Sequence, residues 1–280
     1  MTKQTHHIDF DKLKDFAHVG VRRAVIFMGL GLNAAHREDF LDYELSKIPS
    51  STSERRFPIE FFPEALPAER VNYFKVEFAR WIQDCCLCDL LEHHALFLDK
   101  IHLHALVVYR SLGKLAEKDD PEKLHNKFRH EGIPGKHKTL RERFGVDPKH
   151  SATIDQLYEA RNALTHDFGV VLPKRCDANG NFVLRWPKFN FIGIGNETGK
   201  ETPLAAMIGE RTTEETTIAL RVGQRETTYK AGERIEARTE DLEEVLHFFA
   251  GWAIPSTLTA FVDFLTANGI RQESANASRV

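Results

Sequence analysis

The chain contains one long stretch, from residue 68 to residue 112, in which no proline or glycine occurs. Apolar side chains recur along it at the three- and four-residue spacing of a helix. These positions are Phe74, Phe78, Trp81, Ile82, Leu87, Leu91, Leu98, Ile101, Ala105 and Val108. Gly113 follows at once and suits a helix C-cap. The stretch therefore predicts one extended helix, or two helices with a subtle break.

Capping residues mark three shorter helices after this stretch. Asp120 and Pro121 suit the N-cap and the first position of one helix. Gly145 suits the end of the next helix, and a third begins at Ser151 or Thr153. On the N-terminal side, residues 9–45 have helical periodicity and are expected to form two pieces.

After residue 169 the pattern changes to that of β structure. Apolar residues flank an Asn179-Gly180 pair, which predicts a hairpin, and apolar and polar side chains alternate between 216 and 237. From residue 239 the chain is helical again, with Thr239 as N-cap, a kink at Pro255 and an end at Gly269. The expected fold is mainly α: a helical bundle with a small β insertion before its last helix and an extra N-terminal helical segment.

This organisation divides the chain into six parts. They are an N-terminal helical segment (1–48), a proline-rich connector (49–67), a helical core (68–175), a β insertion (176–238), a C-terminal helix that returns to the core (239–270) and a disordered tail (271–280).

Composition limits the classes of function. A net charge of -3 and a pI of about 6.5 argue against a surface coated in positive charge for indiscriminate nucleic-acid binding, although a local basic patch is allowed. The first ten residues lack the features of a secretory signal, and the apolar run 24–35 is too short to span a bilayer. His247, Pro255 and Asp263 interrupt the later apolar run, which predicts a buried helix. We therefore expect a soluble, cytoplasmic protein with no membrane partner.

Metal and cofactor sites are not expected from the sequence. Cys85, Cys86 and Cys88 crowd into one helical segment, where buried reduced thiols are a simpler interpretation than a zinc site that needs two more ligands. The four histidines between 93 and 104 do not share one helix face. The chain has no phosphate-binding loop, no dinucleotide-binding glycine motif and no Gly-x-Ser-x-Gly sequence.

The segment YEARNALTHDFG, residues 158–169, directs a permanent cation at the core. On a helix, Arg161 falls within the stripe formed by Ile154, Leu157, Leu164 and Phe168. Asn162 and His166, four residues apart, project together at the edge of this stripe, so the three polar side chains converge on one notch. A buried guanidinium without a partner costs on the order of several kcal/mol. Arg161 therefore needs a carboxylate, a water-filled groove or a bound anion.

Arg161, Asn162 and His166, preceded by LYEA and followed by DFG, resemble the motif of the HEPN superfamily (higher eukaryotes and prokaryotes nucleotide-binding domains). That motif is an arginine, usually a polar residue, and a histidine four to six positions after the arginine. The resemblance covers roughly residues 64–175 and the last helix, so it implies a HEPN-like core. Residues 1–63 and the β insertion have no assigned counterpart.

The resemblance implies metal-independent RNA endonuclease activity, in which the 2′-hydroxyl attacks the phosphate. It also implies a homodimer in which two motif helices face one cleft. His166 would transfer protons, Arg161 would bind phosphate oxygens, and Asn162 would orient His166 or the phosphate. A role in a toxin–antitoxin or phage-defence system, with a cognate antitoxin or regulatory partner, follows from the resemblance alone.

A local basic segment precedes the motif helix. Residues 121–150 hold eight lysines and arginines against four acids, and Lys136, Lys138, Arg141 and Arg143 are the candidate contacts to an RNA backbone. A solvated helical face explains the same composition equally well.

Two alternatives to a nuclease stay open. The first is a catalytically inactive HEPN-like module that binds RNA, nucleotides or a protein. The second is an unrelated helical protein in which Arg161 pairs with an acid of the long helix, from Glu77, Asp84, Asp89 and Glu92.

Overall fold

A computed structural model describes residues 8–37 and 68–270 of the chain. The protein is mainly helical, as the sequence predicts, with one antiparallel sheet between α5 and α6. The predicted connector (49–67), the predicted tail (271–280) and the end of the predicted N-terminal segment (38–48) lie outside the described residues.

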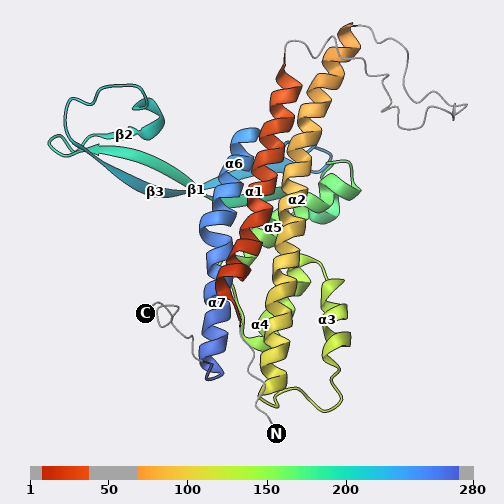
Figure 1. Cartoon of the computed structure of the whole chain (residues 1–280). Helices are drawn as coiled ribbons and strands as arrows, with labels where there is room; N and C mark the ends of the chain where they lie inside the picture. Colours follow the sequence, from red (N-terminus) through yellow and green to blue (C-terminus); the bar gives the residue numbers. More distant parts are fainter. Residues whose placement is uncertain (1–7, 38–67, 271–280) are drawn as a thin grey trace, which may run out of the picture.

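The central element is α2 (Ala68–Ser111), which is one helix of 44 residues without a break. It packs along α1 (Phe10–His36), and the two run in opposite directions (Figure 1). A Cβ atom on Gly20 would lie 2.4 Å from the ring of His93, and one on Gly31 would lie 2.6 Å from Ile82. These glycines permit close packing of the two helices. Because α1 is one continuous helix, the expectation that this region forms two helical pieces is wrong for the described residues.

Three short helices follow on the other side of α2: α3 (Pro121–Arg129), α4 (Ile133–Phe144) and α5 (Ser151–His166). The side chain of Asp120 accepts hydrogen bonds from the backbone N–H groups of Glu122 and Lys123, which confirms it as an N-cap. Gly145 ends α4 with a φ of 71°, a conformation that glycine adopts without steric cost. The N-cap of α5 is His150 rather than Ser151 or Thr153, and it makes no side-chain capping bond.

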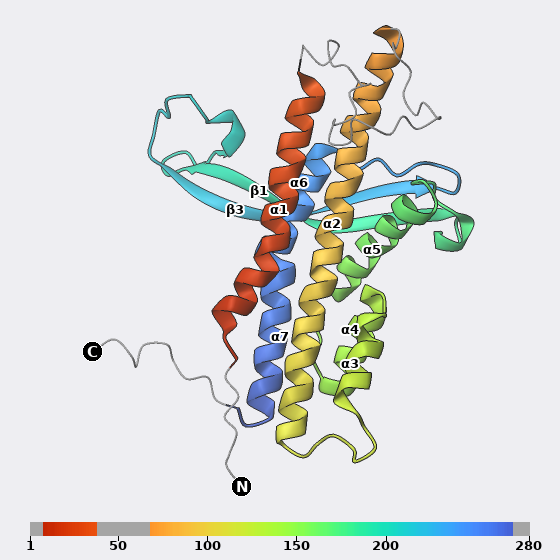
Figure 2. The same ribbon diagram turned by 45° about the vertical axis from the view of Figure 1, so that its right-hand side comes forward.

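The sheet consists of β1 (Asn181–Gly195), β2 (Glu201–Pro203) and β3 (Thr216–Lys230) in the order β2-β1-β3. β1 and β3 pair antiparallel along their whole length, from Asn181 opposite Lys230 to Gly195 opposite Thr216. Near the bundle the hairpin buries Phe182, Leu184 and Trp186 of β1, whereas its far half extends away to one side (Figures 1 and 2).

The predicted hairpin turn at Asn179-Gly180 is wrong. The residues before it form a short 3-10 helix, η2 (Pro173–Arg175), instead of a strand. The carboxylate of Asp177 accepts hydrogen bonds from the backbone N–H groups of Asn179 and Asn181, at 2.8 Å and 3.0 Å, and so closes a local turn. β1 begins after this turn and finds its partner in β3.

The C-terminal helical region consists of α6 (Thr239–Phe248), a π-helical turn η4 (Phe249–Ala253) and α7 (Ile254–Ala267). Thr239 is the first helical residue rather than the N-cap, and its hydroxyl accepts a hydrogen bond from Gln83. The predicted kink at Pro255 takes the form of the wider π turn just before it. The predicted end is confirmed, since Gly269 follows the helix with a φ of 74°.

Among the described helices, the stretch Thr239–Ala267 is long and apolar enough to cross a membrane by length and composition. Half of its most apolar window is buried inside the fold. Its buried side chains include Phe248, Phe249 and Phe261, which belong to the same core as α1 and α2. The core helix predicted from the sequence accounts for this apolar composition.

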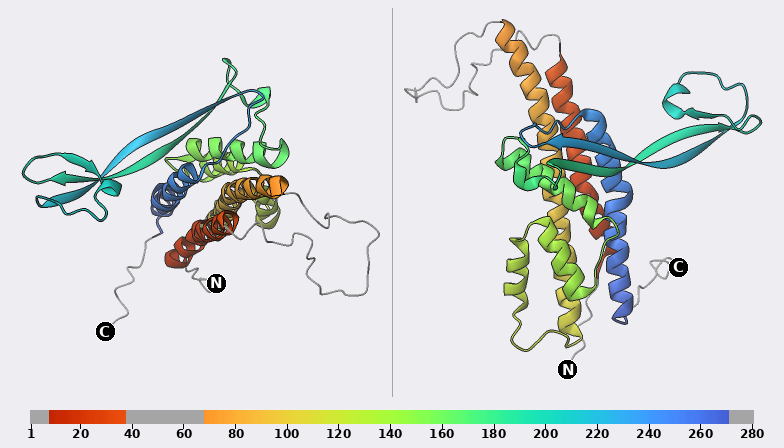
Figure 3. Two further views of the ribbon diagram at one scale, coloured as in Figure 1. Left: turned by 90° about the horizontal axis from the view of Figure 1, so that it is seen from above. Right: turned by 180° about the vertical axis from the view of Figure 1, so that it is seen from behind.

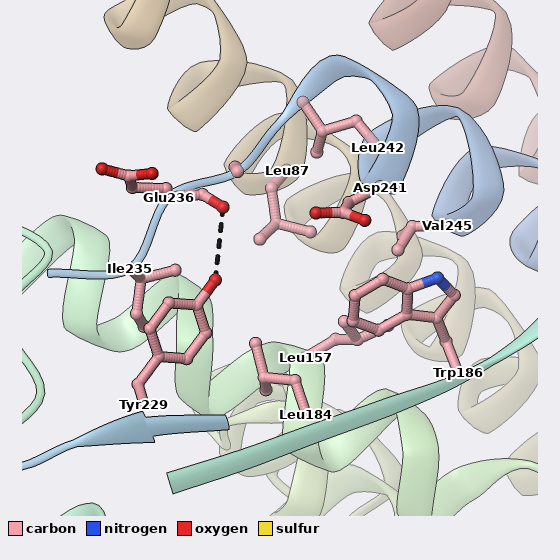
Figure 4. A pocket seen from close by; sticks show the side chains of 11 residues that line it. Leu87, Leu157, Leu184, Trp186, Tyr229, Ile235, Glu236, Asp241, Leu242 and Val245 are labelled. Carbon is pink, nitrogen blue, oxygen red and sulfur yellow. Dashed lines mark hydrogen bonds between the residues drawn. The ribbon is translucent and has the colours of Figure 1, made fainter. Parts of the chain in front are cut away.

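Helix α5 carries Arg161, Asn162 and His166 and is called the motif helix below. Seen from above, it lies between α2 and the base of the hairpin (Figure 3, left). Between the hairpin base, α2 and α6 there is a cavity of about 30 Å³, lined mainly by apolar residues such as Leu157 and Trp186 and also by Glu236 and Asp241 (Figure 4). Ligand pockets for small molecules have volumes of roughly 300–1,000 Å³. This cavity is therefore a packing feature and not a substrate pocket.

Two histidines of α2 are buried in the core in their neutral form. His94 is enclosed by Phe97, Phe249 and His137, and neither of its ring nitrogens has a hydrogen-bond partner within the described residues. Burial, reinforced by the charges of His137 and His93, lowers the pKa of His94 to about 3. Burial and the nearby His125 likewise lower the pKa of His102 to about 3.

We predict that the fold loses stability as the pH falls from about 6.5 towards 3. In this range the two histidines bind protons in the unfolded state but stay neutral in the folded state, so acid favours unfolding. Each histidine contributes at most about 1.4 kcal/mol per pH unit over that window, and nothing above it. Urea unfolding at pH 7, 6 and 5 measures this slope. His94→Phe should flatten it, and His130→Gln, at an exposed histidine, should not. An unchanged slope in His94→Phe would contradict the prediction.

Candidate functional site

The inner face of α5 is fixed by four buried residues: Ile154, Leu157, Ala160 and Ala163. This face packs against α2 and β1. Ala160 and Ala163 are fully buried, and their small side chains leave the helix close to its neighbours. The polar residues of the motif follow directly beside these alanines, so their backbone positions are set by a rigid, packed helix.

The anionic group that pairs with Arg161 is a carboxylate of the same chain. The side chain of Arg161 is 17% exposed, and its Nη2 donates to the carboxylate of Glu92 on α2. Its Nη1 donates to the side-chain oxygen of Asn162 at 3.2 Å. Its guanidinium carbon lies 5.8 Å from the ring centre of Tyr158. Its Nε is buried and finds no acceptor within the described residues, so one donor of the fork is left unsatisfied.

Glu92 is the acid of the long helix that pairs with Arg161; the other three acids named from the sequence face elsewhere. Glu77 pairs with Arg80, Asp84 with Arg234 and Asp89 with Arg23. The side chain of Glu92 is 57% exposed, so the pair lies at the surface and not in the core. Pairing within the chain is the arrangement that an unrelated helical protein predicts. A solvent-exposed carboxylate is also a partner that another anion can replace.

Asn162 and His166 occupy different environments. Asn162 is half-buried and bound to Arg161, whereas His166 is exposed in the last turn of α5. Within the described residues His166 makes no hydrogen bond, ion pair or ring contact. The structure thus joins two of the three motif residues directly. It leaves the imidazole of the third available one turn further along the helix.

An ion-pair network that the sequence analysis missed fastens the end of the motif helix. Arg175 donates two hydrogen bonds to the carboxylate of Asp167, from Nε at 3.1 Å and Nη2 at 2.9 Å. Its Nη1 donates to Glu159. The Arg175 side chain is only 9% exposed. Both bonds go to the same oxygen, Oδ2, and hydrogen bonds between charged groups are stronger than those between neutral groups. The regular spacing of side chains on α5 could not reveal this network, because Arg175 lies outside that helix, in η2.

Burial opposes ionisation of Cys86 and Cys88 on α2. The structure keeps Cys85, Cys86, Cys88 and Cys176 as free cysteines. Burial raises the pKa of Cys88 to about 11 despite the opposing charge of Arg161. Burial raises the pKa of Cys86 to about 12. Only a thiolate is nucleophilic or binds metal, so these thiols are suited to packing.

The predicted RNA-binding set needs one correction. Lys136 is 2% exposed, and its ammonium is paired with Asp99 and lies 4.9 Å from the ring centre of Phe128. A buried lysine cannot reach an RNA backbone. The signal was present in the sequence, since Lys136 shares a helical face with the buried Ile133 and Leu140.

The other three basic residues lie nearer the surface. Lys138 and Arg141 are exposed, and Arg141 is only 3.8 Å from Asp147. Arg143 is half-buried and paired with Asp119. Lys138 and Arg141 are therefore the two members of the set that are open to a polyanion.

In the described parts of the chain, no three histidine, cysteine, aspartate or glutamate side chains are placed to hold a metal ion. A scan against protein-family models, a search of curated proteins and a search of solved structures each returned no match. The function must therefore be argued from the motif helix and its surroundings.

Proposed function

We propose that this protein is a HEPN-like RNA endonuclease that cleaves RNA without a metal ion. The observation that carries the proposal is the exposure of His166, which has no partner among the described residues and lies one turn beyond the Arg161–Asn162 pair on α5. The order of these residues resembles the HEPN motif, and each side chain suits one part of the chemistry. A packed scaffold with an accessible imidazole is the arrangement that a general acid–base catalyst needs.

The proposed reaction begins when the 2′-hydroxyl loses its proton to a base and its oxygen bonds to the adjacent phosphorus. The bond from phosphorus to the 5′-oxygen then breaks, and an acid protonates that leaving oxygen. The products are a 2′,3′-cyclic phosphate and a 5′-hydroxyl end. His166 can serve as base or acid, because an imidazole ring can both accept and donate a proton. Arg161 stabilises the negative charge that gathers on the phosphate oxygens.

The reaction needs both a base and an acid, and each chain supplies one His166. We therefore propose a homodimer formed through α5, in which two copies of the motif serve one cleft. Lys138 and Arg141 are the proposed contacts to the RNA backbone. A cytoplasmic location, a place in toxin–antitoxin or phage-defence systems, and an antitoxin as regulatory partner are further parts of this proposal that rest on the family resemblance.

Incubation of purified protein with RNA in EDTA tests the proposal. We expect cleavage to continue in EDTA and to leave cyclic phosphate ends. An RNA with a single 2′-deoxy substitution at a mapped cleavage position should resist cleavage at that position only. Absence of cleavage, or cleavage that survives the 2′-deoxy substitution, would contradict the proposed chemistry.

The Arg161–Glu92 pair leads to a separate prediction. A phosphate must take the place of the Glu92 carboxylate, and the two anions repel each other. Glu92→Gln removes the charge but keeps an acceptor for Arg161, so RNA should bind about two- to ten-fold more tightly, in keeping with the modest energies of exposed charge pairs. Titration of fluorescent RNA measures the affinity. Glu77→Gln removes a similar charge that faces Arg80 instead and should leave the affinity unchanged.

The inactive binding module is the second candidate. The Arg161–Glu92 pair favours the third candidate, an unrelated helical protein, because Arg161 has a partner without any substrate. The binding module predicts salt-sensitive RNA binding without turnover. A wild-type protein that binds RNA but leaves it intact over long incubation would support the module and not the nuclease.

A further inference from the structure

Phe168 follows the motif helix and is the most exposed of the large apolar residues of the described chain. Its side chain has 89% of its surface in solvent. Large apolar side chains gain free energy from burial, and single exposed ones are common. Exposure of an entire phenylalanine ring beside a proposed active site, however, leaves both faces of the ring free for a ligand.

The backbone of Phe168 is strained as well. Its φ is 53°, and it is the one described residue other than glycine with a positive φ. For a bulky side chain this conformation is a genuine outlier, and it is normally occupied by glycine or asparagine. Strained residues of this kind gather at functional sites. A glycine at position 168 would remove the strain, so the phenylalanine is present at the expense of stability.

Hydrogen bonds on both sides hold this conformation. The backbone N–H groups of Asp167 and Gly169 both donate to the carbonyl oxygen of Ala163, at 3.0 Å and 2.9 Å. The carbonyl oxygen of Gly169 accepts from Ile235 at 2.9 Å, and the carboxylate of Asp167 is bound to Arg175. These hydrogen bonds hold the backbone on both sides of Phe168 in place.

One imidazole and one arginine side chain lie close to the backbone that carries the ring. His166 lies two residues away, so their Cα atoms are at most about 7.6 Å apart, given 3.8 Å between consecutive Cα atoms. The side chain of Arg234, which pairs with Asp84 at 3.7 Å, packs against Gly169, where an added Cβ would come within 3.2 Å of it. An exposed aromatic face beside a basic side chain is a combination that proteins use for single-stranded RNA.

We propose that Phe168 is a stacking platform for a nucleobase next to the scissile phosphate. The proposal rests on the proposed nuclease function and narrows its substrate to RNA that is single-stranded at the cleavage site, since a paired base cannot leave its stack to meet the ring. This role gives a reason for the backbone strain at Phe168. The left-handed conformation directs the ring outward from the end of α5, where a base can reach the ring.

The test compares wild type, Phe168→Ala, Phe168→Gly and Phe168→Trp in binding to a 2′-O-methyl oligonucleotide, which cannot be cleaved. Stacking of one base is worth about 1–3 kcal/mol, so Phe168→Ala should bind roughly 5- to 150-fold more weakly. Phe168→Trp should bind like wild type. Phe168→Gly should have a higher melting temperature than wild type and yet bind as weakly as Phe168→Ala, a combination that a purely structural role does not produce.

An abasic scan of the oligonucleotide locates the base. Removal of the stacked base should weaken binding to wild type and leave binding to Phe168→Ala unchanged, while abasic positions elsewhere should affect both proteins alike. Equal RNA affinities for wild type and Phe168→Ala would overturn the stacking proposal and leave the nuclease standing if wild type still cleaves RNA. A wild type that neither binds nor cleaves RNA would overturn both. Phe168→Ala that loses dimer mass in the absence of RNA would show that the ring docks on a second copy instead.

Discussion

Replacement of His166 by alanine is expected to lower the rate of RNA cleavage by about 10²- to 10⁴-fold, the usual contribution of a positioned general acid or base. The imidazole is exposed and has no partner within the described residues, so its removal should leave the fold intact. Exposed substitutions of this kind change stability by only about 0.5 kcal/mol. The affinity for uncleavable RNA should change little. The effect should therefore fall on kcat.

The measurement compares kcat and KM of wild type and His166→Ala on one mapped RNA site, together with urea unfolding. His130→Ala is the matched control, because His130 is an exposed histidine at the end of α3 and outside the motif. Arg161→Lys should also reduce cleavage, since lysine keeps the charge but lacks the planar fork. Cleavage by His166→Ala at the wild-type rate would remove the imidazole from the mechanism.

Lys136→Met is expected to destabilise the protein by about 3–5 kcal/mol, the usual result of removing one member of a buried ion pair. Lys136 and Asp99 are both buried, and they face each other across α4 and α2. Without the lysine, the carboxylate of Asp99 stays in the core with no opposite charge. A loss this large is comparable to a substantial part of the stability of a domain.

Urea or guanidinium unfolding at pH 7 measures this loss. Lys138→Met is the matched control on the same helix, because Lys138 is exposed, and its stability should stay within about 0.5 kcal/mol of wild type. The double variant Lys136→Met with Asp99→Leu should recover most of the loss, since it removes both charges and fills the space with apolar atoms. A stable single variant with weakened RNA binding would return Lys136 to the RNA-binding set.

The helices of this protein follow closely from local sequence signals. The absence of proline and glycine between 68 and 112 allows α2 to run unbroken, and Asp120 and Gly145 cap their helices by local side-chain and backbone geometry. The position of the motif on α5 was predicted in the same way. These features depend on residues within one or two helical turns, so the sequence alone is sufficient to predict them.

The partners of charged residues required the folded chain. Arg161 needed an anion by helix geometry alone, but its choice of Glu92 depends on how α5 crosses α2. The helical face of Lys136 indicated that its side chain points inward, whereas its charge favoured an exposed position. Its buried partner Asp99 comes from another helix, so the sequence did not reveal the ion pair. Contacts between distant segments carry no signal in a single sequence.

The pairing of β1 with β3, and the strain at Phe168, were likewise decided only in three dimensions. The Asn179-Gly180 pair has the composition of a hairpin turn, yet Asp177 closes a local turn there and β1 pairs with a strand far along the chain. The sequence by itself determined which segments are helical and which side chains carry the proposed chemistry. Tertiary structure decided which of these side chains are neutralised, buried or left open, because desolvation and ion pairing depend on neighbours that are remote in sequence.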